Sequence, residues 1–233
     1  MKQKTLSIII PAYNEIETIS KVLEKIEKAD IGNVKKEIII VDDGSTDGTR
    51  NFLQKQKKKY KVIFHKKNMG KGFAVRTGIK NATGEVVIIQ DADLEYDPND
   101  YKKLIDPILL GKSEVVYGSR RLHKKNKQYS GLSFFVGGVS LTIIANLLYP
   151  NLKITDEPTC YKVFKADVIK SIPLECKRFE FCPEVTAKVA KRHIKIKEVP
   201  IKYFPRHSDE GKKIKWKDGV EAVWTLLKYR FVN

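Results

Sequence analysis

The sequence contains a series of short apolar runs, rich in β-branched residues, that alternate with longer segments of helical spacing. The runs occupy residues 6–10, 37–41, 62–64, 86–89 and 114–117. Between them, apolar residues recur every three or four positions, as at Ile16, Ile19, Val22, Leu23 and Ile26, which is the spacing of a helix. The first half of the chain is therefore predicted to fold as β-α-β-α-β-α-β.

Continuous apolar runs are typical of strands that are buried on both faces of a parallel sheet. Because right-handed crossovers through helices make successive strands parallel, we predict an open, mostly parallel, doubly wound α/β sheet of Rossmann-like architecture. Ligands of such sheets bind outside the carboxyl ends of the strands. Three polar motifs stand at these ends, PAYNE at 11–15, DDGSTDGT at 42–49 and DADLE at 91–95, and we expect them to meet in one site.

The length of 233 residues suffices for one domain with a substantial core, and we predict a single domain over residues 1–233. Lys and Arg number 45 against 28 Asp and Glu, so the net charge is +17. This charge favours anionic partners such as nucleic acid, anionic lipid or phosphorylated small molecules, although a lysine-rich soluble surface would explain it equally.

The three cysteines have no C-x-x-C spacing, so the sequence predicts neither a disulfide framework nor a zinc site. Reduced thiols fit a cytosolic protein. The N-terminus has only a short apolar run, broken at Pro11, and no cleavage site of small residues. It is therefore interpreted as a first strand and not as an export signal.

Three carboxylates follow the fourth apolar run, where a buried strand should reach the surface. Asp91 and Asp93 can both turn toward a ligand, and Glu95 stands two residues further on. Such oxygen ligands suit Mg²⁺ or Mn²⁺, which are bound by one or two carboxylates together with the phosphates of a substrate. An acidic turn that caps the next helix is the alternative. An EF-hand is excluded, because Tyr96 replaces its glycine and Lys102 its bidentate glutamate.

The motif NMGKGFAVRTG at 68–78 hints at phosphate binding. It is not a Walker motif, because Gly72 follows Lys71 where Ser or Thr is required, and Val75 replaces the last glycine of a Rossmann fingerprint. A helix start with glycines can still contact a diphosphate, with Lys71 or Arg76 as charge partners. A glycine loop with solvated lysines is the alternative.

Asp42 and Asp43 end the second apolar run, and Ser45 or Thr46 can cap the helix that follows. An acidic residue at this place in a doubly wound sheet commonly accepts hydrogen bonds from a ribose or a base. The pair therefore favours a nucleotide ligand.

No charged residue occurs from position 128 to position 152. Within this stretch, one apolar stripe at helical spacing predicts a helix at 132–149; it consists of Leu132, Val136, Val139, Ile143 and Leu147. The helix is expected either to lie in the core, to lie on a membrane surface or to span a bilayer. Spanning would place motifs of one site on opposite sides of the membrane, which argues against it.

The motifs PAYNE, VDDGSTDGT, GKGFAVRTG, DADLEYDP and GSR stand in one order along the chain. With them the sequence resembles the family 2 glycosyltransferases of GT-A fold, and within that family the dolichyl- and polyprenyl-phosphate mannose or glucose synthases. The resemblance covers nearly the whole chain. It implies one GT-A domain in which residues 1–120 bind a nucleotide sugar and residues 121–233 form a smaller region that faces the acceptor and the membrane.

The resemblance also implies which residues bind the nucleotide sugar. They are Pro11, Tyr13, Glu15, Asp42 or Asp43, Lys71, Asp91, Ala92 and Asp93. The metal, Mg²⁺ or Mn²⁺, is expected on Asp91, Asp93 and Glu95, where relatives often carry Gln at the last position.

On the acceptor side, Arg120 in YGSRR matches an arginine that the family uses on phosphate. The segment 155–164, TDEPTCYKVF, takes the place of the family's D-P-x-S-G-F-F-A and keeps its acidic residue as Asp156, an expected acceptor-site or sugar-orienting group. Arg206 and Lys212 stand in the family's flexible loop, with Gly and Glu in swapped order, and are expected to close over the phosphates. The catalytic residues implied are Asp93, Asp156 and Arg120.

The reaction that the resemblance implies is an inverting hexosyl transfer from a donor of the GDP-mannose or UDP-glucose type to a polyprenyl or dolichyl phosphate. A divalent ion neutralises the departing diphosphate. The acceptor needs little help from a base, because a phosphate monoester has a second pKa of about 6 and is largely dianionic at neutral pH. The surplus of lysine and the uncharged helix then favour reversible, peripheral attachment to the cytoplasmic face of an anionic membrane.

Two alternatives stay open. Transfer to a soluble or polysaccharide acceptor would use the same donor half and would require a general base, for which Asp156 is the candidate. A basic nucleic-acid-binding protein would suit the charge, but the sequence has no recognised nucleic-acid-binding motif and acidic strand ends repel phosphates. Nucleic acid is therefore not expected as a partner.

Overall fold

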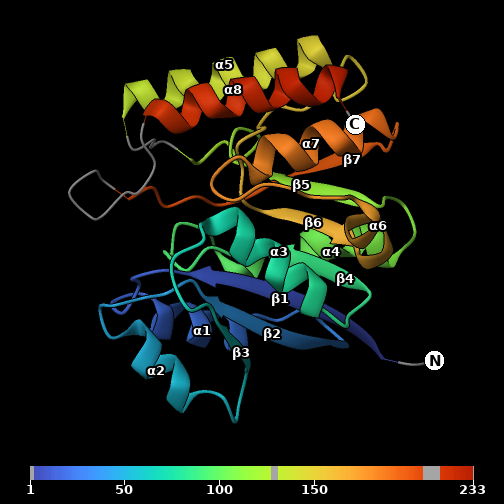
Figure 1. Ribbon diagram of the computed structural model, residues 1–233. Helices are drawn as coiled ribbons and strands as arrows, with labels where there is room; N and C mark the ends of the chain where they lie inside the picture. Colours follow the sequence, from blue (N-terminus) through green and yellow to red (C-terminus); the bar gives the residue numbers. More distant parts are fainter. Residues whose placement is uncertain (1–2, 127–130, 207–215, 233) are drawn as a thin grey trace.

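The computed structural model of the protein describes residues 3–126, 131–206 and 216–232. Its centre is a seven-stranded sheet with the strand order β3-β2-β1-β4-β6-β5-β7 (Figure 1). The strands are β1 (Lys4–Ala12), β2 (Val34–Asp42), β3 (Lys61–Phe64), β4 (Val86–Ile89), β5 (Val115–Ser119), β6 (Lys162–Lys165) and β7 (Ile196–Pro200). Only β6 runs antiparallel to its neighbours among these strands, so the predicted, mostly parallel sheet is confirmed.

Helices cover both faces of the sheet. On one face lie α1 (Ile19–Lys28), α2 (Thr49–Lys55) and α4 (Tyr101–Leu109), and a short 3-10 helix, η1 (Pro98–Asp100), precedes α4. On the other face lie α3 (Lys71–Asn81), α6 (Ala166–Ser171) and α7 (Phe181–Lys191). Within β1, Ile8 packs into the first core and Ile9 into the second. This burial on both faces explains why the strand is a continuous apolar run.

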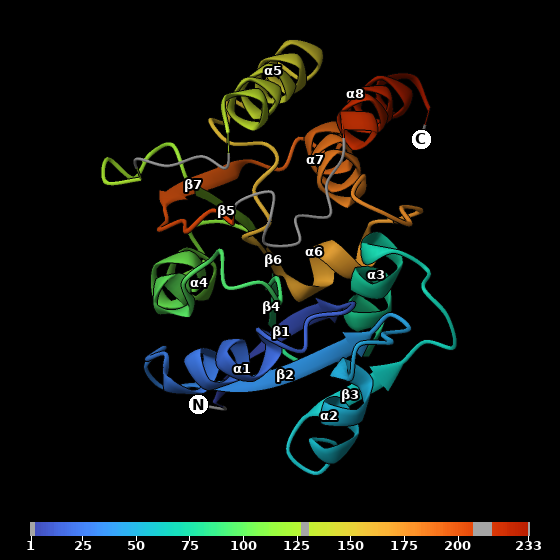
Figure 2. The same ribbon diagram turned by 90° about the vertical axis from the view of Figure 1, so that its left-hand side faces the viewer.

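A third layer lies beyond α7. It consists of α5 (Leu132–Leu148) and α8 (Trp216–Phe231), which lie side by side along one side of the molecule in both views (Figures 1 and 2). Leu141 and Ala145 of α5 pack with Leu226 of α8 and Ala187 of α7. The helix predicted at 132–149 is confirmed, and no helix in the described ranges is long and apolar enough to cross a membrane.

The five predicted strands are all present, whereas β6, β7 and α8 were not predicted. β6 enters the sheet between β4 and β5 and pairs with both. Because it is antiparallel, the chain that leads into β6 lies at the edge where β4 ends. Residues of the segment 155–161 are therefore brought to the carboxyl ends of the parallel strands.

Candidate active site

The loops that follow β1, β2 and β4 meet at one edge of the sheet, as predicted. Ala12 at the end of β1 lies opposite Asp42 at the end of β2. The loops are also bonded to each other: the Asn14 N–H donates to Oγ of Ser45 at 3.0 Å, and the Thr46 N–H donates to Oδ1 of Asn14 at 2.8 Å. Side chains from the first and second motifs are thereby fixed at the same edge of the sheet.

Asp42 and Asp43 are both buried and have protein partners. Asp42 accepts a hydrogen bond from Nε of Arg50 at 2.8 Å. Asp43 accepts from the Gly70 N–H at 2.7 Å and lies 2.7 Å from Nδ1 of His65. The two carboxylates therefore hold together the loops at this edge of the sheet, and their contact with a ribose or a base stays a prediction.

The start of α3 is bonded to the turn that precedes α7. The Gly72 N–H donates to the carbonyl of Arg178 at 2.8 Å, and the Phe73 N–H donates to that of Lys177 at 3.1 Å. The close approach requires glycine, because a Cβ on residue 72 would lie 2.8 Å from the Arg178 carbonyl oxygen. These two N–H groups are therefore already used within the protein, and contact between this helix start and a diphosphate stays a prediction.

Of the two predicted charge partners in this motif, only one reaches the acidic loop. Nη1 of Arg76 donates to the backbone carbonyl of Glu175 at 3.0 Å. Nζ of Lys71 instead forms an ion pair with Oδ1 of Asp91 at 2.6 Å. Burial lowers the pKa of Lys71, but the charge and hydrogen bond of Asp91, together with the nearby Cys160 and Cys182, outweigh burial and raise the pKa above its ordinary value. Lys71 therefore stays a cation in the site.

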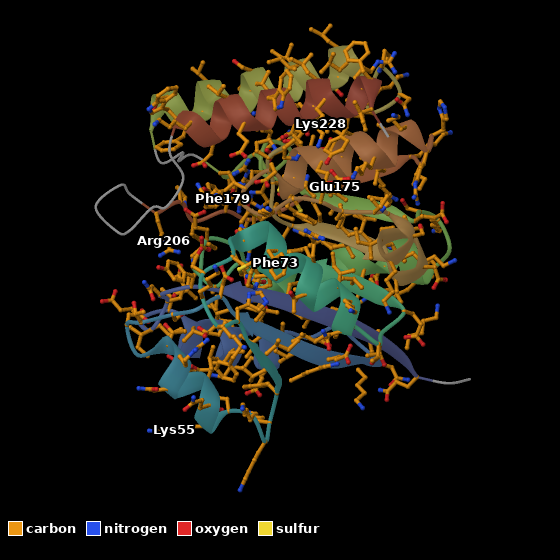
Figure 3. The ribbon with its side chains drawn as sticks, in the orientation of Figure 1. Lys55, Phe73, Glu175, Phe179, Arg206 and Lys228 are labelled. Atoms are coloured by element: carbon orange, nitrogen blue, oxygen red, sulfur yellow. The ribbon has the colours of Figure 1, made fainter. Side chains whose placement is uncertain are left out.

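A second cation, Arg206, meets the other aspartate of the acidic loop. Its Nη2 lies 3.2 Å from Oδ2 of Asp93 and 3.4 Å from Oε1 of Glu15, so it bridges the loops after β4 and β1. Figure 3 shows Arg206 and Phe179 on the side of the molecule where β1 ends, and the ring of Phe179 lies 5.9 Å from Nζ of Lys71. Two basic side chains thus face Asp91 and Asp93 from opposite halves of the chain.

Glu95, the third predicted metal ligand, is used within the protein. Its Oε1 accepts a hydrogen bond from the Arg206 N–H at 2.8 Å, and its Oε2 accepts one from the hydroxyl group of Tyr203 at 3.2 Å. No cluster of three or more His, Cys, Asp or Glu side chains able to hold a metal occurs among the described residues. The arrangement nevertheless fits an ion that takes one or two carboxylates and completes its shell with substrate phosphates.

Arg120 and Asp156, predicted separately, form one buried pair. The guanidinium donates from Nε to Oδ2 at 2.8 Å and from Nη2 to Oδ1 at 2.7 Å, and the Arg120 N–H also donates to Oδ2 at 2.8 Å. Burial raises the pKa of Asp156, but the charge and hydrogen bonds of Arg120 outweigh burial and lower it. A carboxylate with a lowered pKa and three such bonds is a poor general base. Asp156 therefore holds the guanidinium of Arg120 in place.

Three residues that support the site were not predicted. Glu198 of β7 accepts hydrogen bonds from the N–H groups of Thr155 at 2.7 Å and Asp156 at 3.1 Å, so it fixes the loop that carries Asp156. Oε1 of Gln90 accepts from the hydroxyl groups of Tyr101 and Tyr161, each at 2.6 Å, beneath the acidic loop. Cys160 accepts from Nζ of Lys71 at 3.3 Å. The only sequence signal was the alternation of Ile and Lys over residues 194–197, where β7 begins.

The other predicted residues are placed as follows. Pro11 is buried within β1, Tyr13 is half-buried in the loop after it, and Ala92 is buried between the two aspartates. Lys212 lies outside the described residues. The structure thus brings Glu15, Lys71, Asp91, Asp93 and Arg206 together and places the Arg120–Asp156 pair next to them, since Arg120 stacks on the ring of Tyr203 at 5.0 Å.

Comparison with known proteins identifies the family. The family model described as glycosyl transferase family 2 matches residues 7–172. The chain belongs to glycosyl transferase family 2. This family 2 protein is therefore a glycosyltransferase.

Two relatives are similar to this glycosyltransferase over most of its length. The UDP-N-acetylglucosamine–dolichyl-phosphate N-acetylglucosaminyltransferase of Methanococcus voltae is 33% identical in an alignment 222 positions long, which covers 87% of this chain and 86% of the relative. The dolichol-phosphate mannosyltransferase of Pyrococcus furiosus is 31% identical in an alignment 232 positions long, which covers 96% of this chain and 64% of the relative.

Solved structures confirm the GT-A fold. Glucosyl-3-phosphoglycerate synthase from Mycobacterium tuberculosis, crystallised with Mn²⁺, uridine diphosphate and phosphoglyceric acid, superimposes with a TM-score of 0.74 at 20% identity. The match covers 99% of this chain and 80% of the synthase chain.

Proposed function

We propose that this glycosyltransferase moves a sugar from a nucleoside diphosphate sugar to the phosphate of a polyprenyl or dolichyl lipid. The observation that carries the proposal is the pairing of Asp91 with Lys71 and of Asp93 with Arg206 beside the buried Arg120–Asp156 pair. Such a site offers carboxylates for a cation and three basic side chains for phosphates. The names of the Methanococcus and Pyrococcus relatives, both of which act on dolichyl phosphate, support this acceptor class.

On the donor side, Asp91 and Asp93 would hold Mg²⁺ or Mn²⁺, because such an ion takes one or two carboxylates together with the phosphates of the substrate. The ion would neutralise the charge of the departing nucleoside diphosphate. We assign Glu95 to positioning, since its two oxygens bond Arg206 and Tyr203. Lys71 stays beside the diphosphate as a fixed cation, and Glu15 holds Arg206 near the acidic loop.

On the acceptor side, Arg120 binds the lipid phosphate and orients one oxygen toward the anomeric carbon of the sugar. That oxygen forms the new bond as the bond to the diphosphate breaks, with inversion at the anomeric carbon. A phosphate monoester is largely dianionic at neutral pH, with a second pKa of about 6, so no side chain has to remove a proton. A hydroxyl acceptor would require such a base, and the lowered pKa of Asp156 disfavours that alternative.

The proposal places residues 1–120 on the nucleotide sugar and residues 121–233 on the acceptor. It also places the reaction at the cytoplasmic face of an anionic membrane, with the protein attached peripherally. The net charge of +17 supports attraction to such a surface. Nucleic acid is no partner in this proposal, because Asp91, Asp93 and Glu15 would repel its phosphates.

The test has a binding step and a transfer step. Thermal shifts with UDP- and GDP-sugars, with and without Mn²⁺, identify the donor, and radiolabelled sugar is then offered to polyprenyl phosphate in detergent. We expect transfer that chelation abolishes and that Asp93→Asn abolishes, whereas Asp167→Asn, a change at an 87% exposed side chain, leaves it intact. Label appearing only on water-soluble hydroxyl acceptors would contradict the proposal.

A further inference from the structure

Helix α8 exposes a stripe of large apolar side chains. Trp216 is 76% exposed, Val220 60%, Trp224 64% and Phe231 82%. Successive residues of a helix are separated by about 100°, so positions 0, 4, 8 and 15 of this helix lie on one side. The four side chains therefore form one continuous stripe along the helix.

This stripe lies opposite the face of α8 that packs on the protein. The packed face consists of Ala222, Leu226 and Tyr229, which are 7%, 0% and 4% exposed. A helix of a soluble protein normally places polar residues on the side away from the core. α8 instead has two apolar sides, and packing within the described structure accounts for only one of them.

Helix α5 repeats the pattern. Its Leu141 and Ala145 pack on α7 and α8, while Val136, Ile143 and Leu147 are 52%, 53% and 74% exposed on the opposite side. The two helices lie side by side as the outermost layer of the molecule in both views (Figures 1 and 2). We call the combined stripes the α5/α8 surface; its members are Val136, Ile143, Leu147, Trp216, Val220, Trp224 and Phe231.

The charge around the α5/α8 surface selects the partner. On α8 the basic residues Lys217, Lys228 and Arg230 outnumber the acidic residues Asp218 and Glu221 by one, and α5 has no charged residue. The sequence adds three lysines in GKKIK immediately before Trp216. A second copy of a chain with a net charge of +17 would be repelled, whereas anionic headgroups would be attracted. Tryptophan next to lysine and arginine is also the composition typical of the membrane–water interface.

We propose that the α5/α8 surface docks on an anionic lipid bilayer, with both tryptophans at the level of the headgroups. The purpose of this docking rests on the proposed lipid-linked acceptor. In the sequence, Arg120 stands 12 positions before the start of α5, and Arg206 stands 10 positions before the start of α8. Docking through these helices would bring the half of the chain that contains both arginines to the bilayer that holds the acceptor.

The protein carries its own reporter for this contact. Its two tryptophans, Trp216 and Trp224, both belong to the α5/α8 surface, so intrinsic fluorescence reports on this surface alone. Vesicles of phosphatidylcholine with phosphatidylglycerol should shift the emission to the blue, and brominated lipids should quench it. Vesicles of phosphatidylcholine alone should bind at least roughly tenfold more weakly, because several basic residues lose their attraction.

Matched variants test whether vesicle binding depends on the α5/α8 surface or on any exposed apolar side chain. Leu147→Ser with Val220→Ser retains both tryptophans and should weaken binding to anionic vesicles by at least roughly tenfold. Leu110→Ser, at a 66% exposed leucine beyond the end of α4, should leave binding unchanged. Equal binding of the double variant and the native protein would overturn the proposal. So would a blue shift without lipid together with dimers in analytical ultracentrifugation, because the α5/α8 surface would then join two copies.

The same variants distinguish this inference from the proposed function. With a short-chain, water-soluble prenyl phosphate, the double variant should transfer sugar at the native rate, and with a long-chain acceptor in vesicles it should lose at least roughly tenfold in rate. Loss with both acceptors would overturn docking as the role of these side chains. Failure of the native protein to use either acceptor, together with normal vesicle binding, would refute the proposed acceptor and leave the docking surface intact.

Discussion

Replacement of Asp156 by Asn tests whether this buried carboxylate positions Arg120. The side chain of Asp156 is 1% exposed and that of Arg120 15%, and three hydrogen bonds join the two residues. Breaking a buried ion pair by neutralising one partner costs about 3–5 kcal/mol, because the other charge stays buried. The amide of Asn keeps one acceptor for the guanidinium, so we expect a loss near the lower end, about 3 kcal/mol in the free energy of unfolding.

Urea denaturation with pH as a second variable measures this loss. The folded pKa of Asp156 is lowered relative to the unfolded chain, so the stabilisation is complete above the unfolded value of about 3.9 and is lost as the pH falls through the folded pKa. The native protein and Asp156→Asn should therefore differ most near neutral pH and converge in acid. Turnover with lipid phosphate should fall, while the midpoints of the pH–rate profile stay where they are.

Two results would refute the reasoning. An unfolding free energy within about 0.5 kcal/mol of the native value would show that the pair does not hold Arg120, since surface changes are of that size. A variant that loses the acid limb of the pH–rate profile but keeps its stability would show that Asp156 accepts a proton in the reaction. Asp167→Asn, at an exposed position, is the control for both measurements.

Three further predictions concern the donor side and the helices. Asp93→Asn should abolish turnover and lower the melting temperature less than Asp156→Asn does, because the side chain of Asp93 is 19% exposed and that of Asp156 1%; an Asp93→Asn variant with native activity would exclude Asp93 from the site. Arg206→Gln should bind Mn²⁺ more tightly in calorimetry without nucleotide, since a competing cation leaves Asp93, and unchanged affinity would show that the ion binds elsewhere. Gly72→Ala should destabilise by roughly 1–3 kcal/mol in urea because its Cβ would meet the Arg178 carbonyl at 2.8 Å, whereas Gly219→Ala, in open space on α8, should stabilise by up to about 1 kcal/mol.

The first half of the fold was predictable because its strands are buried on both faces. β4 was predicted at residues 86–89 and occupies them, since an apolar run between two cores has no other favourable environment. The later strands lacked this signal. β6 has only four residues and contains a buried lysine, Lys162, whose Nζ donates to the Glu157 carbonyl at 2.7 Å. A lysine whose charge is satisfied by a backbone carbonyl in the preceding loop cannot be recognised as buried from sequence.

The candidate site shows the same limit. That Asp91, Asp93 and Arg206 would lie near each other followed from strand ends and family motifs. Two other contacts join loops that are far apart in the sequence and were not predicted. The Gly70 N–H donates to Asp43, and carbonyls of the turn before α7 accept from N–H groups at the start of α3. The motifs identified the residues of the site, but only the packed structure shows which of their polar atoms are already used.

The direction of β6 has a practical consequence for work with this protein. Because β6 runs against its neighbours, the loop entering it lies at the ligand edge, and the amino ends of β2, β4 and β5 lie at the opposite edge. The turns there contain Gly32 and Gly111, around which a Cβ would meet no atom within 4 Å. Fluorophores, affinity tags or inserted domains attached at these two turns would therefore lie at the edge of the sheet opposite the candidate site.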